Sequence, residues 1–138
     1  MKRGSTMGPL ALLAACTMPQ WVSLGHKNSG KVRVEEFVDV SSIRVVGDIR
    51  RAEWMMLYPA HATKGEGAYA GKWVSNYDFH STYNCNRYNS KFESSKIYYE
   101  DGTSSQMPSG SKLKEWEPVL PDTTNEAAMK FVCSRKSK

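Results

Sequence analysis

Three cysteines, Cys16, Cys85 and Cys133, are the residues with the clearest chemical roles in this chain of 138 residues. Cys16 closes a basic and then apolar N-terminal stretch of the kind that directs export. Cys85 and Cys133 would then be the thiols left in the exported chain, and an oxidising compartment favours their pairing. We predict a Cys85–Cys133 disulfide. Two inert buried thiols, or a disulfide between the two chains of a dimer, are the alternatives.

The N-terminal stretch resembles the precursors of bacterial lipoproteins. Lys2 and Arg3 are followed by an apolar run, and Leu13-Ala14-Ala15-Cys16 resembles the recognition site of lipoprotein signal peptidase. Leu13 is unfavourable for ordinary signal cleavage, which prefers a small residue there. The other interpretation is a buried N-terminal helix with an inert Cys16, which Gly8-Pro9 would break.

This resemblance implies a lipoprotein signal peptide over residues 1–15 and an acylated Cys16 that anchors the chain in a membrane. Residues 16–20 would be the lipidated cysteine and a short linker, and residues 21–138 the domain. Thr17 stands where many inner-membrane lipoproteins carry Asp, so we expect the outer membrane. Whether the domain faces the cell surface or the periplasm stays open.

Catalytic and metal-binding residues are not predicted. Asp78 and His80 lie two residues apart and could pair as a base and its orienting acid. Because no nucleophile is implied nearby, we interpret them as polar residues on the solvent side of a strand. His26 and His61 are distant from His80 and show no metal-ligand spacing. Gly65-Glu66-Gly67 lacks the Lys-Ser/Thr ending of a phosphate loop. We therefore expect no enzymatic activity, no bound metal and no cofactor.

The elements that must hold these residues are mainly strands. Residues 73–85 place aromatic side chains and Cys85 at odd positions and polar side chains at even ones, the alternation of a half-buried strand. A second strand follows to Tyr99, with a phase change that predicts a bulge near Ser94 and Ser95. We expect the aromatic side chains Tyr77, Phe79 and Tyr83 to form core beneath a helix rather than a ligand platform.

Further strands are predicted over residues 21–24, 31–40, 49–58, 103–107 and 113–119, with a loop over residues 59–71. The second of these strands alternates valines with charged residues, apart from Glu36 and Phe37, and bends at residues 39–43. A capping box, Thr123 with Glu126, opens a C-terminal helix with Ala128 and Val132 on one face. The sequence therefore predicts an α+β, mainly β fold: an antiparallel sheet of about six strands and one short C-terminal helix, tethered by the disulfide.

Composition excludes some classes of function. The formal net charge is +5, and the basic residues are scattered without the aromatic-plus-basic motif of a nucleic-acid-binding module. No stretch approaches the length of a transmembrane helix. We expect one domain, no nucleic-acid partner and attachment to a membrane only through the lipid. The oligomeric state stays open, and a dimer is one alternative.

Several short motifs resemble the surface-adhesin protein E family in their order and spacing. They are Trp21-Val22, Phe37-Val38-Asp39 with Ser42-Ile43, Trp54, Cys85-Asn86-Arg87-Tyr88, Trp116-Glu117-Pro118-Val119 with Pro121, and Phe131-Val132-Cys133. The resemblance covers residues 21–133. It implies a small exported or lipidated protein of Gram-negative bacteria, whose helix is tethered by a disulfide and which binds extracellular-matrix or serum proteins.

A periplasm-facing lipoprotein with a structural or inhibitory role is the second class of function. The string from Tyr58 to Gly65 resembles the Y-x-x-x-T-K-G string of periplasmic lysozyme-inhibitor lipoproteins, with one residue too many. Lysozymes are usually basic, as this chain is, so electrostatic steering between the two would be unfavourable. The sequence names neither a ligand nor its contact face.

Overall fold

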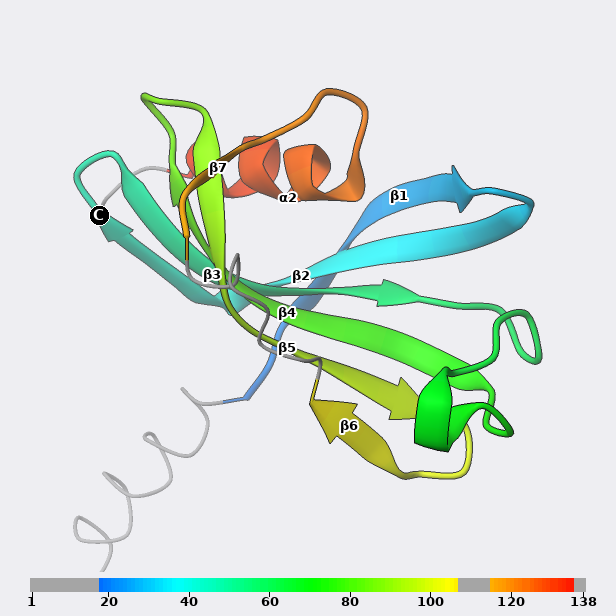
Figure 1. Ribbon diagram of the computed structural model, residues 1–138. Coiled ribbons are helices and arrows are strands. Elements are labelled where there is room, and N and C mark those ends of the chain that lie inside the picture. Colours follow the sequence, from blue (N-terminus) through cyan, green and yellow to red (C-terminus); the bar gives the residue numbers. More distant parts are fainter. Residues whose placement is uncertain (1–17, 107–114, 136–138) are drawn as a thin grey trace, which may run out of the picture.

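The computed structural model describes residues 18–106 and 115–135 as a twisted antiparallel sheet with a helix on one face (Figure 1). The elements are β1 (Trp21–Ser29), β2 (Val32–Val46), β3 (Ile49–Leu57), the 3-10 helix η1 (Gly67–Tyr69), β4 (Val74–Asn84), β5 (Asn89–Tyr99), β6 (Ser104–Gln106), β7 (Glu117–Pro118) and α2 (Thr124–Cys133). The predicted fold class is confirmed. Cys16 and the predicted signal peptide lie outside the described residues. Within the described residues, no helix is long and apolar enough to cross a membrane.

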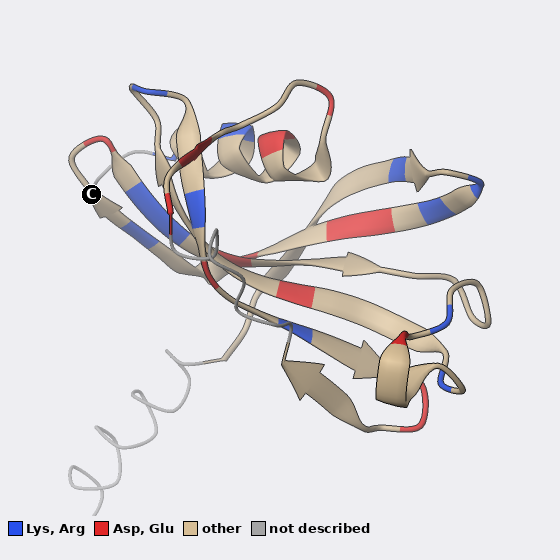
Figure 2. Ribbon diagram, viewed as in Figure 1, with Lys and Arg blue, Asp and Glu red and all other residues tan. Residues whose placement is uncertain are grey.

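The strands follow one another across the sheet in the order of the sequence, β1 to β6, and the two-residue β7 pairs with β5. Each pair of neighbouring strands is antiparallel and is joined by a turn or loop, so most strand pairings are local in sequence. The predicted turn at Asp101 and Gly102 connects β5 to β6, and Gly102 supplies a positive φ of 89°. Figure 2 shows acidic and basic residues scattered over the strands and turns.

β2 is longer than predicted because the predicted bend is a register shift inside a continuous strand, between Asp39 and Arg44. The Asp39 carboxylate holds this irregularity, since its Oδ1 accepts hydrogen bonds from Gln20 N, Ser41 N and Ser41 Oγ at 2.8, 3.0 and 2.6 Å. Ser42 Oγ donates to Asp39 O and accepts from Glu53 N, at 2.7 and 2.8 Å. The Asp39 and Ser42 side chains therefore replace the missing ladder bonds of the shift.

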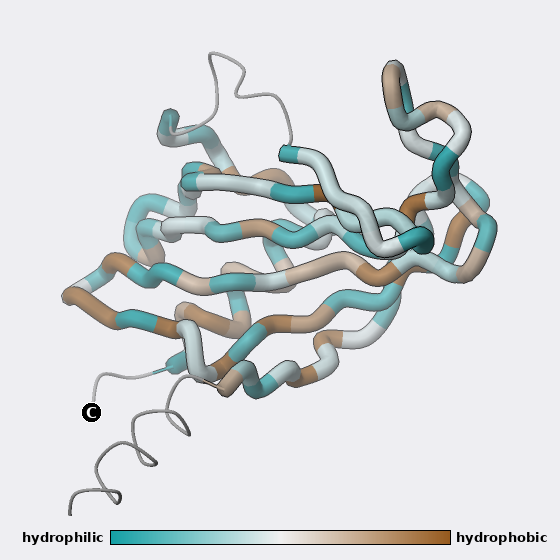
Figure 3. The backbone as a smooth tube through the Cα atoms, turned by 90° about the horizontal axis from the view of Figure 1, so that it is seen from below, coloured by the Kyte–Doolittle hydropathy of each residue, from teal (hydrophilic) through white to brown (hydrophobic). Residues whose placement is uncertain are grey.

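The core lies between the sheet and α2, on what we call the helix face. Trp54 and Phe79 stack there with ring centroids 4.4 Å apart, and Trp54 Nε1 donates to Ser81 Oγ at 2.9 Å. Phe79 and Tyr83 are buried, which confirms their prediction as core. The Tyr83 hydroxyl donates to Asn125 Oδ1 of α2 at 2.9 Å, which satisfies its polar end. Figure 3 shows apolar and polar residues alternating along the strands.

α2 begins as its capping box predicts, with one difference. Thr123 Oγ1 accepts from Glu126 N at 3.1 Å, but Glu126 Oε1 accepts from Asp122 N, at 2.9 Å, instead of from the N-cap residue. Ala128, Met129 and Val132 are buried against the sheet. The predicted disulfide is confirmed: Cys85, in the β4–β5 turn, is bonded to Cys133 with their Cα atoms 5.8 Å apart. The hydroxyl of Tyr88, in the same turn, also donates to Glu126.

Candidate functional site

The helix face extends beyond the area that α2 covers, and its far part forms the floor of a cavity. Tyr77 on β4 lies two residues from the buried Phe79 and is paired across the ladder with Ile97 on β5, so both share the helix face. The cavity has a volume of about 420 Å³. Its floor is Tyr77, Ile97 and Tyr99, and β6 contributes Ser105 and Gln106 to one side. A mostly apolar cavity with a few polar groups is the usual form of a ligand site.

The segment between β3 and β4, residues 58–73, forms the outer wall of this cavity, and residues 59–71 of it were predicted as a plain loop. Gly65 N donates to Lys72 O at 2.8 Å, and η1 brings Tyr69 back over the sheet. The Tyr69 ring stacks on Tyr99 with centroids 4.9 Å apart and planes within 4°. Gly65 is the residue that permits this approach, because a Cβ there would lie 2.5 Å from Tyr69 O and 2.9 Å from Tyr99 Cε1.

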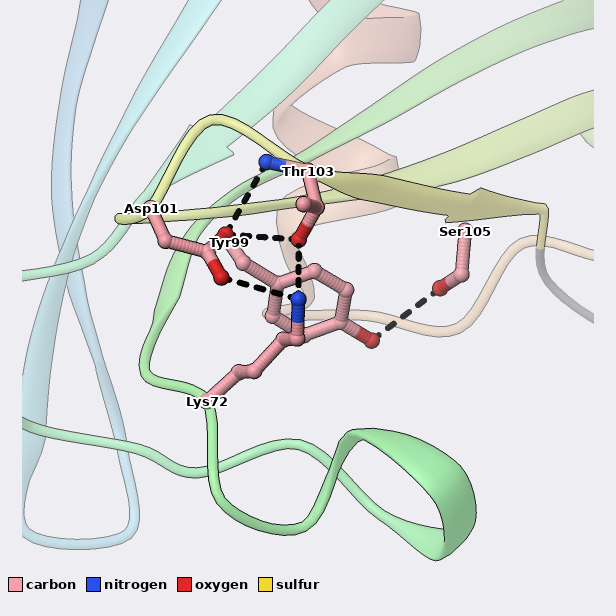
Figure 4. Close-up of polar contacts among 5 residues, drawn as sticks. All are labelled: Lys72, Tyr99, Asp101, Thr103 and Ser105. Atoms are coloured by element: carbon pink, nitrogen blue, oxygen red, sulfur yellow. Dashed lines mark hydrogen bonds and ion pairs between the residues drawn. The ribbon is translucent and has the colours of Figure 1, made fainter.

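Polar contacts tie the wall to the β5–β6 turn (Figure 4). Lys72 Nζ donates to Asp101 Oδ2 at 2.8 Å and to Thr103 Oγ1 at 2.9 Å. Hydrogen bonds from Lys72 and then from Thr103 hold the pKa of Asp101 below its usual range. Tyr99 and Ser105 share a hydrogen bond of 3.0 Å between their hydroxyls, next to the cavity. The two Lys72 contacts link segments about 30 residues apart in sequence and fix the position of the wall.

The charges around the cavity are mostly paired. His61 contacts Glu100, with 3.2 Å between Nε2 and Oε1, and Lys72 pairs with Asp101. Glu66 lines the cavity and has no ion-pair partner within residues 18–106 and 115–135. Burial, followed by the charges of Glu66 and Tyr99, raises the pKa of the Tyr77 phenol. The cavity therefore combines tyrosine rings with one carboxylate that has no ion-pair partner in the described part of the chain, while Lys64, which also lines it, has its ammonium over the Trp73 ring.

We expect Gly65→Ala to destabilise this wall. The added methyl group would overlap the Tyr69 carbonyl, which is backbone and cannot simply rotate away, at a cost of about 1–3 kcal/mol. Amide hydrogen exchange should accelerate in residues 63–73, and chemical denaturation should show a lower midpoint. Gly71→Ala is the matched control, since a Cβ there meets nothing within 4 Å. Equal exchange rates and midpoints in the two variants would contradict the packing described for Gly65.

The string that resembles lysozyme inhibitors is part of this wall. Thr63 O accepts a hydrogen bond from Val74 N at 2.8 Å, and Lys64 forms an isolated antiparallel β-bridge with Trp73. The Lys64 ammonium lies 4.9 Å from the centroid of the Trp73 ring. Backbone pairing and this cation–π contact hold the string against the domain, so its geometry gives no support to insertion into an enzyme cleft.

A second polar cluster lies on the opposite face of the sheet. His80 is exposed there, as predicted, and the ladder between β3 and β4 places Glu53 directly opposite it. Ligand-type atoms of Glu53, Asp78 and His80 lie within 4.8 Å of one another. Burial and a hydrogen bond with Glu53 raise the pKa of Asp78 to about 8. Ligation through Asp78 would require the loss of this proton, because a carboxyl group binds a metal in its ionised form.

Sequence reasoning found part of the cavity and missed the rest. Tyr77 was predicted as core beneath the helix, and it does pack against the core while its half-buried ring also lines the cavity. Glu66 and Tyr69 were not predicted as site residues, since their contribution depends on the fold of the wall. The aromatic residues of the wall were the sequence feature that could have indicated a site there.

The described residues form a small disulfide-tethered sheet with a ligand-sized cavity, an arrangement suited to binding. The family model for surface-adhesin protein E matches residues 21–134, and the chain belongs to this family. No curated protein sequence matches the chain. Membership of this family indicates a surface or exported protein that binds other molecules and is not an enzyme, and it implies binding to host molecules.

Proposed function

We propose that this protein is a lipoprotein of the outer membrane that presents a protein-binding domain, with extracellular-matrix or serum proteins as partners. The family match carries the proposal, because it spans the whole sheet and the helix from residue 21 to residue 134. The described fold supports it, since the disulfide between Cys85 and Cys133 is a bond of oxidising compartments.

The proposed anchor is a diacylglycerol and an amide-linked acyl chain on Cys16. Together these chains exceed the two signals needed for stable membrane attachment. β1 begins at Trp21, five residues beyond Cys16, and five extended residues reach at most roughly 17 Å. The domain would therefore be held next to the membrane that anchors it, with the partner approaching from the far side.

Protease treatment of intact bacterial cells tests the orientation of the domain. With an epitope tag after Lys138, we expect the domain to be degraded on intact cells after brief reduction, which exposes the helix tether. A periplasmic protein measured in the same samples controls for leakage. Protection until the outer membrane is permeabilised would reject surface display and would favour the periplasm-facing alternative, a structural or inhibitory lipoprotein.

A further inference from the structure

We propose that the cavity beneath residues 58–73 binds a cationic side chain, the alkylammonium group of a lysine, from a protein partner. The inference rests on the proposed function, because it names the group of the partner that the domain would recognise. It follows from three features of the cavity: its charges, its rings and its size.

The charges favour a cation. Lys64 borders the cavity, but its ammonium is placed over the Trp73 ring, and Lys72 is bonded to Asp101 and Thr103. The carboxylate of Glu66 is left without an ion-pair partner in the part of the chain that the structure describes. An anionic ligand would meet this carboxylate, whereas a cationic one would pair with it.

The rings favour the same charge. Tyr69, Tyr77 and Tyr99 line the cavity from the wall and from two strands, and Tyr77 is itself packed on Tyr58 at 5.4 Å between ring centroids. The face of an aromatic ring carries a partial negative charge, which attracts an ammonium group. Together with Glu66, the tyrosines therefore form an environment that is apolar and electronegative at once.

The dimensions and the lining fit a lysine side chain. A volume of about 420 Å³ accommodates four methylene groups and an ammonium with room for water. The methylene groups would contact Ile97 and the tyrosine rings, while Ser105 and Gln106 offer oxygen acceptors to the ammonium. A neutral apolar side chain would fill the same space but would desolvate Glu66 without pairing it.

Titration of the domain with three short peptides tests the proposal. The peptides are Gly-Ser-X-Ser-Gly, with X as lysine, trimethyl-lysine or norleucine, which keeps the alkyl chain and lacks the charge. We expect the lysine and trimethyl-lysine peptides to shift the amide resonances of Gly65, Tyr69 and Ile97 in a nuclear magnetic resonance titration. Their affinity should exceed that of the norleucine peptide by about 3- to 10-fold and should fall at high salt.

Glu66→Gln should remove most of this preference, and Glu35→Gln, an exposed carboxylate on β2, should leave it unchanged. Equal affinity for lysine and norleucine, or shifts confined to other parts of the sheet, would overturn the proposal, as would equal effects of the two variants. The proposed function can fail while this proposal stands. If the domain prefers lysine but is protected from protease on intact cells, the cation site is supported and surface display is rejected.

Discussion

Replacing Cys85 and Cys133 with Ser should leave the strands formed and free α2 from the sheet. The bond closes a loop of 48 residues, and its loss should lower the free energy of unfolding by roughly 4 kcal/mol on the chain-entropy estimate. A helix of ten residues has little stability alone, so it depends on this bond and on its buried face. Far-ultraviolet circular dichroism should retain its strand signal, while the C-terminal segment should become sensitive to protease.

Reduction of the unmodified domain is the control, because it should reproduce the behaviour of the double variant. Denatured, unreduced domain lacking Cys16 should contain no titratable thiol and should run as a monomer on a non-reducing gel. Two free thiols per chain, or a covalent dimer, would contradict the intrachain bond. A melting temperature unchanged by reduction would show that the packing of α2, through Ala128, Met129 and Val132, holds the helix by itself.

Glu36→Gln should stabilise the protein at alkaline pH. The Glu36 side chain is only 2% exposed on the helix face of β2, and its Oε2 has no hydrogen-bond partner among the described residues. Burial raises its pKa to about 8, partly offset by the charge of Lys27. The folded state thus binds a proton that the unfolded chain releases near pH 4.5, so stability falls as pH rises from about 4.5 to about 8.

The full loss at and above pH 8 is on the order of 4–5 kcal/mol for this group. Urea denaturation at several pH values should show a fall in stability over this window, and Glu36→Gln should remove much of it. Part should remain, since burial also raises the pKa of Asp78 to about 8. Glu35→Gln, its exposed neighbour, should follow the unsubstituted protein. Parallel pH profiles for the Glu36 and Glu35 variants would contradict the burial of an unpaired carboxyl.

Local patterns in the sequence predicted the features that depend on neighbouring residues. The capping Thr123, the aromatic alternation before Cys85 and the Asp101 turn each follow from the geometry of one element. The predicted bulge lies between Phe92 and Ser94 in β5, one residue before its expected place. In β2, Glu36 is a charged residue at a position where the alternation of the strand predicts an apolar one. The alternation itself is unbroken, since the side chain of Glu36 is buried like those of Val34 and Val38.

Features set by distant residues could not be predicted. Glu53 faces His80 only through the register of β3 on β4, and the wall of the cavity is fixed by contacts of Lys72 with Asp101 and Thr103. β1 extends well beyond residue 24 because Gly25, at a φ of 101°, permits a bulge in an exposed edge strand. The polar second half of β1 lacks the alternation of apolar and polar residues that would have predicted a strand.

The proposed function depends above all on the lipid anchor at Cys16, which intact-mass spectrometry of protein extracted from bacterial membranes can detect. The predicted product begins at Cys16, carries a diacylglycerol and an amide-linked acyl chain, and has lost residues 1–15. The mass should also lack the two hydrogens released by the Cys85–Cys133 bond. A mature chain that begins upstream of Cys16, or one whose Cys16 is unmodified, would contradict the proposal of a lipoprotein.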